Sequence, residues 1–198
     1  MIPRHLIIGI AVMLAVALGM SFYVLRMRRG ERAESAVASS RPVTPPVSGP
    51  TEQVTLYVAY DDAGVLRPTP ARIPLPAGRQ ERAEELLRAL LGLYLDKPSP
   101  HPLGMGSEVR AVYLVDPGLV VLDLNAAFAD GHRSGVLVEE LTMASLVQTL
   151  AANIPGIARV KILVDGKERE TLAGHADLSN FYDVSTMNQL VAQMSAGQ

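Results

Sequence analysis

Apolar and polar residues alternate at the start of the region that we expect to fold. Across residues 51–60 the apolar positions include Val54, Leu56 and Val58, two residues apart, which is the period of a β-strand. Residues 65–75 are also extended in pattern, but they carry prolines, which cannot donate a hydrogen bond to a neighbouring strand. The pattern therefore predicts a first strand followed by an irregular edge strand.

Two later segments change to the period of an amphipathic helix. In the first, apolar residues recur three and four positions apart across 83–94, and Pro98 follows its end. The second is predicted to run from Ser134, as the N-cap, to about Asn153. Because its apolar stripe is broad and no charged residue occurs across 141–158, we expect this helix to be the core helix, packed on a sheet.

Short apolar runs between and after these helices predict the remaining strands. Two strands, 109–115 and 119–124, are separated by an Asp-Pro-Gly turn of the kind that closes a hairpin. A third, 157–164, alternates apolar residues with Arg and Lys, which predicts a half-buried strand. The Asp-Gly pair after it predicts a second hairpin, which returns 167–172 as a short strand.

The order of these elements predicts one α+β domain over residues 52–184. Helices separated by hairpins favour two helices packed on one face of a mainly antiparallel sheet. The chain contains no cysteine, which excludes disulfides, thiolate nucleophiles, Cys-based zinc sites and the acylated cysteine of a bacterial lipoprotein. We expect residues 185–198 to be a flexible C-terminal tail.

The apolar run near the N-terminus is of a different kind. Residues 6–25 contain no charge, and twenty residues are the length that a helix needs to cross a bilayer. They lack the small-residue pattern of a signal-peptide cleavage site, so we predict an uncleaved transmembrane helix. Residues 26–51 form a basic flank and a Pro/Ser-rich linker without apolar periodicity, which predicts a disordered tether.

The formal net charge of −2 is unevenly distributed along the chain. Residues 1–51 carry six Arg and two Glu, or +4, which leaves −6 for the rest of the sequence. An acidic domain repels a phosphate backbone, so we expect no nucleic-acid partner. Four arginines lie between positions 26 and 32, directly after the predicted span, and the positive-inside rule taken alone would place the domain in the cytoplasm.

The C-terminal half carries a recognisable combination of motifs. A strand ends in VVLDL at 120–124, a Glu stands near the start of the long helix at 139, and a Thr-Leu pair lies late in that helix at 149–150. A V-x-I-L-V-D-G-K strand and turn follows. These motifs resemble the GerMN (sporulation and spore germination) family, and the similar layout of the first half extends the resemblance to about residues 52–178.

The resemblance implies an exported domain that is tethered to a bacterial envelope. This sequence carries a single copy of the domain behind its predicted anchor. The resemblance also implies a protein-interaction or assembly module rather than an enzyme, with envelope proteins or cell-wall-associated machinery as partners and no catalytic residues. It therefore conflicts with the arginines after the span. We favour export, because a translocated domain of this length can override a modest bias in the flank.

One polar patch offers an alternative, a small envelope enzyme or metal-binding protein. Its core is Asp123, Asp130, His132 and Glu139, with Asn125 and Glu140 beside them. Their spacing matches neither a zinc-binding helix nor a calcium loop. We therefore expect no catalytic, metal or cofactor site here, but a solvated loop followed by carboxylates in the first turns of a helix, where the helix dipole favours negative charge.

The other candidate residues have structural interpretations. Ser134 follows His132 and Asp130 too closely in the chain to form a nucleophile triad with them, and no Gly-x-Ser-x-Gly turn presents it. We expect His101, between two prolines, to be an exposed loop residue, and His175 to close a turn against the core. A third hypothesis, a membrane adaptor that faces the cytoplasm, follows from the basic flank.

Overall fold

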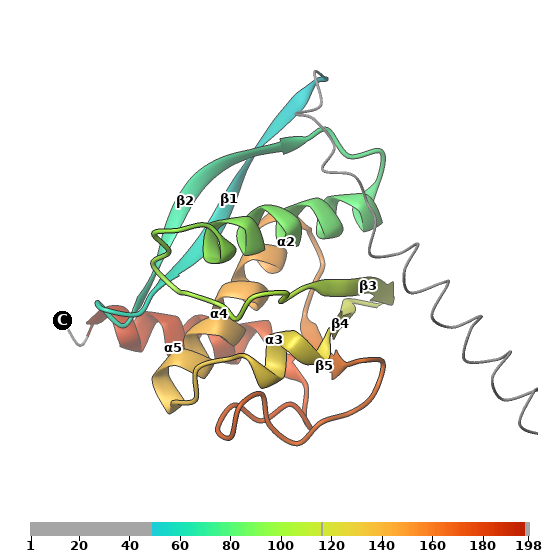
Figure 1. Ribbon diagram of the computed structural model, residues 1–198. Coiled ribbons are helices and arrows are strands. Elements are labelled where there is room, and N and C mark those ends of the chain that lie inside the picture. The colour runs from blue at the N-terminus through green and yellow to red at the C-terminus, as the bar shows by residue number, and fades with distance from the viewer. Residues whose placement is uncertain (1–48, 116, 197–198) are drawn as a thin grey trace, which may run out of the picture. The chain divides into compact units, whose positions relative to one another are not determined.

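The computed structural model describes residues 49–115 and 117–196 (Figure 1). The predicted transmembrane helix at 6–25 and nearly all of the linker at 26–51 lie outside these residues. Within the described part of the chain, no helix has both the length and the hydropathy required to cross a bilayer. Element labels below follow Figure 1.

The first two strands form a separate antiparallel ribbon. Strand β1 (Thr51–Tyr60) pairs with β2 (Val65–Pro74) along its whole length, from Thr51 opposite Pro74 to Tyr60 opposite Val65. This confirms the predicted first strand and the proline-containing strand that follows it. The side chains of Val54, Leu56 and Val58 are buried on one face of the ribbon, as the alternation in the sequence indicated.

The remaining strands form a second, mixed sheet in the order β3-β4-β5-β6. These strands are β3 (Val109–Val115), β4 (Leu119–Leu124), β5 (Arg159–Val164) and β6 (Tyr182–Asp183). The pairs β3–β4 and β5–β6 are antiparallel, but β4–β5 is parallel. The prediction of a single sheet was wrong, because the ribbon and this sheet are separate, although three of the four strand pairs are antiparallel as predicted. The pair β4–β5 is parallel because a helix connects the two strands, and such a crossover returns the chain in the same direction.

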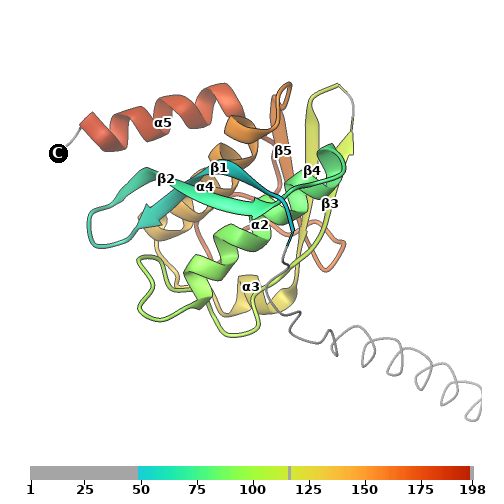
Figure 2. The ribbon, with the colours of Figure 1, turned by 90° about the horizontal axis from the view of Figure 1, so that it is seen from above.

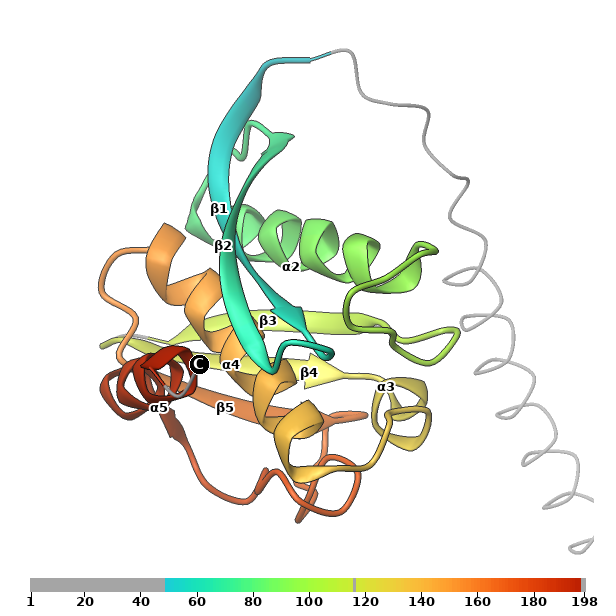
Figure 3. The ribbon, with the colours of Figure 1, turned by 90° about the vertical axis from the view of Figure 1, so that its left-hand side faces the viewer.

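Two helices lie between the ribbon and the mixed sheet (Figures 1 and 3). Helix α2 (Arg79–Leu95) and helix α4 (Val136–Asn153) both contact β1, and α2 also contacts β3. Every residue of α4 from Leu141 to Leu150 is buried, since the helix has sheet on two sides. The α+β class and the central position of this helix are confirmed.

The start of α4 and the segment after β5 differ from the predictions. Gly135, with φ 157°, is the N-cap of α4, and Ser134 instead lies 3.4 Å from His175 through its Oγ atom. Residues 167–172 do not form a strand. A single bridge joins Val164 to Lys167, after which the chain enters a long loop that side chains from the core hold in place.

Two further helices were not predicted. Helix α3 (Ala126–Asp130) is a short turn after β4, and helix α5 (Val184–Ala196) occupies the segment that we expected to be a flexible tail. Helix α5 lies against α4 and β2 (Figure 2). The apolar residues on its packed face are Met187, Leu190, Val191 and Met194. The folded unit begins at Gly49 and extends beyond residue 184 to include this helix.

Tyr182 in β6 provides a test of packing at this end of the sheet. Among the described residues its hydroxyl is the buried side-chain atom without a hydrogen-bond partner, and burial raises the pKa of its phenol. Because an unpaired buried hydroxyl is unfavourable, Tyr182→Phe is expected to raise the free energy of unfolding by about 1 kcal/mol. Urea unfolding would measure the change, with the exposed Tyr113→Phe as control; a less stable Tyr182→Phe protein would contradict the expectation.

Candidate functional site

The structure separates the four core residues of the predicted polar patch. Asp130 forms an exposed ion pair with an arginine of the long loop, at 2.7 Å. Asp123 accepts a backbone hydrogen bond, His132 bonds a threonine hydroxyl, and Glu139 accepts several backbone donors. Across residues 49–115 and 117–196, no group of three or more His, Asp or Glu residues is placed to hold a metal ion. The four residues therefore do not form a common site.

Glu139 is the most completely bonded of these residues, and its side chain is 0% exposed. Its Oε2 atom accepts hydrogen bonds from the backbone N–H groups of Ala173, His175 and Ala176 at 2.9–3.0 Å. Its Oε1 atom accepts from the His175 ring at 2.9 Å and from the Gly135 N–H at 3.1 Å. One buried carboxylate thus joins the start of α4 to the loop between β5 and β6.

These hydrogen bonds set the charge state of Glu139. Burial alone raises the pKa of the carboxyl, but the donors from Ala176, His175 and Ala173 outweigh it and lower the pKa from 4.5 to about 2. The group is therefore ionised at every physiological pH. An acid that is this strongly ionised and fully enclosed stabilises the backbone around it and is not placed to transfer a proton to a substrate.

Asp123 and Asn125 act on neighbouring turns. The Asp123 carboxylate accepts the N–H of Gly166 at 2.7 Å, which fixes the Asp165-Gly166 turn after β5. Asn125 is the N-cap of α3, where its Oδ1 accepts the N–H of Phe128 at 2.9 Å. Both side chains are therefore used to position the backbone.

Polar side chains of α4 and α2 cover the free edge of β1, a feature that the sequence analysis missed. Five backbone groups of β1 that point away from β2, in Thr55, Tyr57 and Ala59, meet a hydroxyl or an amide where a further strand would otherwise lie. The contacts are Thr55 N–H and C=O with the Asn153 amide (3.1 and 2.7 Å), Tyr57 N–H with Thr149 Oγ1 (2.9 Å), Tyr57 C=O with Ser145 Oγ (2.6 Å), and Ala59 N–H with the Tyr94 hydroxyl (2.8 Å).

The repeat lengths of helix and strand explain why this arrangement fits. The helix residues Ser145, Thr149 and Asn153 are four positions apart, or about 6.0 Å along the axis. The outward-facing residues of β1 are two positions apart, or about 6.7 Å. Asn153 therefore meets Thr55 and Thr149 meets Tyr57, and Ser145 bonds the carbonyl of Tyr57 as well. This assigns a structural role to Thr149, one of the residues that carry the family resemblance.

The free edge of β2 is protected by proline. In an antiparallel pair, residues opposite each other point their backbone groups the same way, either toward the partner strand or away from it. Since Thr55 and Tyr57 point away from β2, their partners Pro70 and Pro68 also point outward. Pro74, opposite Thr51, follows the same alternation. The prolines therefore remove N–H donors from the solvent edge and leave the pairing with β1 intact.

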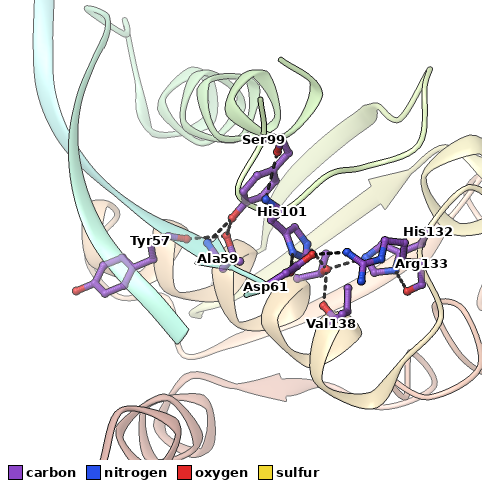
Figure 4. Close-up of polar contacts among 11 residues, drawn as sticks. Tyr57, Ala59, Asp61, Ser99, His101, His132, Arg133 and Val138 are labelled. Atoms are coloured by element: carbon purple, nitrogen blue, oxygen red, sulfur yellow. Dashed lines mark hydrogen bonds and ion pairs between the residues drawn. The ribbon is translucent and has the colours of Figure 1, made fainter. Parts of the chain in front are cut away.

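His101 is 1% exposed and lies at the centre of a buried polar chain, so the prediction that it is an exposed loop residue was wrong (Figure 4). Its Nδ1 atom lies 2.5 Å from Asp61 Oδ1, and its Nε2 atom lies 2.7 Å from Thr142 Oγ1. The Nε2 atom of His132 also lies 2.7 Å from that hydroxyl, and its Nδ1 atom donates to the Arg133 carbonyl at 2.8 Å. We call the five residues Asp61, His101, Thr142, His132 and Arg133 the relay.

The order Asp61, His101, Thr142 resembles an acid, a base and a nucleophile, but its setting does not suit catalysis. Thr142 is 1% exposed in the middle of a core helix, and its hydroxyl lies 2.9 Å from the Val138 carbonyl one turn earlier. A nucleophile needs a reacting atom of the substrate at hydrogen-bond distance. The space around this hydroxyl is filled by two histidine rings.

Comparison with known proteins places the chain in a family. The Germane family model, described as sporulation and spore germination, matches residues 55–170. A search among curated proteins gave no match.

Solved structures of low identity are similar to this chain. The first GerMN domain of the sporulation protein GerM from Bacillus subtilis is 18% identical, with a TM-score of 0.50, over 68% of this chain and 98% of that one. The tandem GerMN domains of the same protein give the same identity and TM-score over 68% of this chain and 46% of that chain. A putative lipoprotein from Clostridium perfringens is 19% identical, with a TM-score of 0.48, over 73% and 94%. The family model spans more than half of the sequence, and this protein therefore belongs to the sporulation and spore germination family, in agreement with the resemblance of its motifs.

Proposed function

We propose that this protein is a non-catalytic domain of the bacterial cell envelope that acts as a protein-interaction or assembly module. Residues 6–25 would anchor it in the membrane, and the domain would lie outside the cytoplasm. Family membership supports an envelope role. The internal use of Asp123, Glu139 and Thr149, each bonded to backbone amides, supports a role in which these residues hold the fold and a partner binds elsewhere.

The proposal rests on the exposed outer face of the β3–β4 pair. Tyr113 and Val115 of β3 are 55% and 44% exposed. Their register partners on β4, Val121 and Leu119, are only partly buried and share the same face. Phe181, 49% exposed, lies beside it, with the guanidinium of Arg159 over its ring. An exposed apolar patch of this kind is typical of a protein contact.

Strand addition to the ribbon is a less suitable mode of contact for a partner. Side chains cover the edge of β1, and prolines remove donors from the edge of β2. The edge of β3 faces α2, where the Gln80 amide donates to the Val112 carbonyl. We therefore place the contact on the outer face and not on these edges.

Site-directed crosslinking of the full-length protein in its own membrane would test the surface. A photoreactive residue at Tyr113 is expected to give a discrete protein adduct, and the same residue at the exposed Arg88 of α2 is expected to give none. Val115→Glu should lower the yield at Tyr113 by about tenfold, since a charge in an apolar contact costs more than about 1.4 kcal/mol. Equal adducts at both positions, or a small ligand without any protein, would contradict the proposal.

Membrane orientation has a separate test. A reporter fused after Gln198 is expected to be active only when the reporter functions outside the cytoplasm. The arginines between positions 26 and 32 favour the opposite orientation and hence a cytoplasm-facing adaptor. Activity of a cytoplasmic reporter alone would establish that alternative and exclude ours.

A further inference from the structure

The relay connects segments that are distant in the sequence. Asp61 is at the tip of the β1–β2 ribbon, His101 is in the loop after α2, and Thr142 is in α4. His132 and Arg133 follow α3, and the Arg133 guanidinium also binds Asp61, at 2.9 Å. A backbone hydrogen bond also joins the tip to the loop, from the Asp61 N–H to the Pro100 carbonyl at 3.0 Å. The relay thus links the tip and the loop to α4 through side chains.

Hydrogen counting shows that the relay is short of protons when both rings are neutral. The carboxylate of Asp61 and the carbonyl of Arg133 are acceptors, so each neighbouring Nδ1 atom must carry a hydrogen. A neutral imidazole has one N–H, which leaves both Nε2 atoms as acceptors. Both then face the Thr142 hydroxyl, whose single hydrogen also has the Val138 carbonyl as an acceptor at 2.9 Å. At least one ring nitrogen is therefore left without a donor in the neutral state.

Adding protons changes this balance in two steps. The first proton makes one ring a cation, which supplies the missing hydrogen bond and is balanced by the Asp61 carboxylate. The second proton creates two cations whose ring centroids are 6.0 Å apart, with the Arg133 guanidinium also bonded to Asp61. Of the other groups that face the rings, Tyr94 packs edge-on to His101, and the carboxylate of Glu139 attracts charge on His132. Repulsion at such short range and in a buried site opposes the doubly charged state.

Burial acts in the same direction on both rings. It lowers the pKa of His101 from its ordinary value of 6.5, although the hydrogen bond and charge of Asp61 oppose the shift. It also lowers the pKa of His132, where the Arg133 carbonyl opposes the shift and the charge of His101 adds to it. Because an opened segment would bind protons with the ordinary pKa, acid favours opening by linkage.

We propose that the relay is an acid-released latch. It holds the ribbon tip and the loop around His101 against α4 while the two rings share at most one added proton, and it releases both segments when both rings become charged. This inference is independent of the partner and of the outer face proposed above.

Hydrogen exchange of the full-length protein at pH 7.5 and pH 5.0 would test the latch. After correction for intrinsic exchange, protection of segments 60–64 and 98–104 is expected to fall at least about tenfold at pH 5.0. Protection of β4 should not change, because its neighbours carry no relay group. Unchanged protection of the two segments would overturn the proposal.

Variants separate the latch from general acid sensitivity. His132→Gln removes one titrating ring and keeps a side chain that can bond Thr142, so it should reduce the acid effect to less than half. His175→Gln, outside the relay, should retain the full effect. An equal fall in protection in His132→Gln and in the wild type would contradict the latch. If His132→Gln does not fold, NMR titration of the His101 and His132 rings in the wild type tests the proposal instead. A titration midpoint at or above pH 6.5 for both rings would overturn it.

Discussion

Replacement of Glu139 by Gln is expected to lower the free energy of unfolding at pH 7 by about 3 kcal/mol. The pKa of the buried carboxyl is lowered from 4.5 to about 2, and each unit corresponds to about 1.4 kcal/mol. A Gln side chain keeps one acceptor oxygen, but its NH₂ group would meet N–H donors from Ala173, His175 and Ala176. Such a loss is a large fraction of the free energy of unfolding of a typical domain, which is roughly 5–15 kcal/mol.

The pH dependence of this variant gives an independent check. Because the pKa of Glu139 is lower in the folded state, its stabilisation is complete above pH 4.5 and is lost as the pH falls toward 2. The difference in stability between wild type and Glu139→Gln should therefore shrink across that range. Urea unfolding at several pH values would measure it. Glu140→Gln, one residue along α4 and only partly buried, is the matched control and should change stability by less than about 0.5 kcal/mol.

The local elements were predictable because their periodicity is strong. The strands at 51–60, 109–115 and 119–124 and the core helix up to Asn153 were all predicted from apolar spacing. Helix α5 could also have been found, since its packed residues follow the three- and four-residue spacing of a helix. The division into two sheets could not be predicted from the sequence, because it depends on which strands pair across distant parts of the chain.

The polar residues show a similar limit. Asp123, Glu139 and Thr149 stand out in the sequence as family motifs, but their partners are 43, 37 and 92 positions away, and spacing along the chain does not reveal them. His101 between two prolines has the sequence context of a surface loop. Its burial follows from two partners on other elements, each about 40 positions distant. A residue type can suggest chemistry, whereas the partner decides between a reactive site and a structural contact.

The covered edge of β1 leads to the second large prediction. The double variant Thr149→Val, Asn153→Leu keeps the approximate shapes of both side chains but removes their hydrogen bonds to Tyr57 and Thr55. Three backbone groups would lose their partners, at about 1 kcal/mol or more each, so we expect a loss of about 3 kcal/mol. The amides of Thr55 and Tyr57 should also exchange faster, which hydrogen exchange would detect directly.

The exposed edge that this variant creates should change association as well as stability. An unpaired strand edge can pair with a strand of another molecule. In this protein the side chains of α4 and α2, and not a neighbouring strand, cover the edge of β1. The double variant should therefore self-associate at concentrations where the wild type does not, as measured by light scattering. Thr186→Val, on the exposed side of α5, makes a comparable hydroxyl-to-methyl change and should affect neither property. Normal stability and normal amide protection in the double variant would show that water replaces these side chains without cost. The hydrogen bonds from Thr149 and Asn153 would then not be what holds β1 against α4.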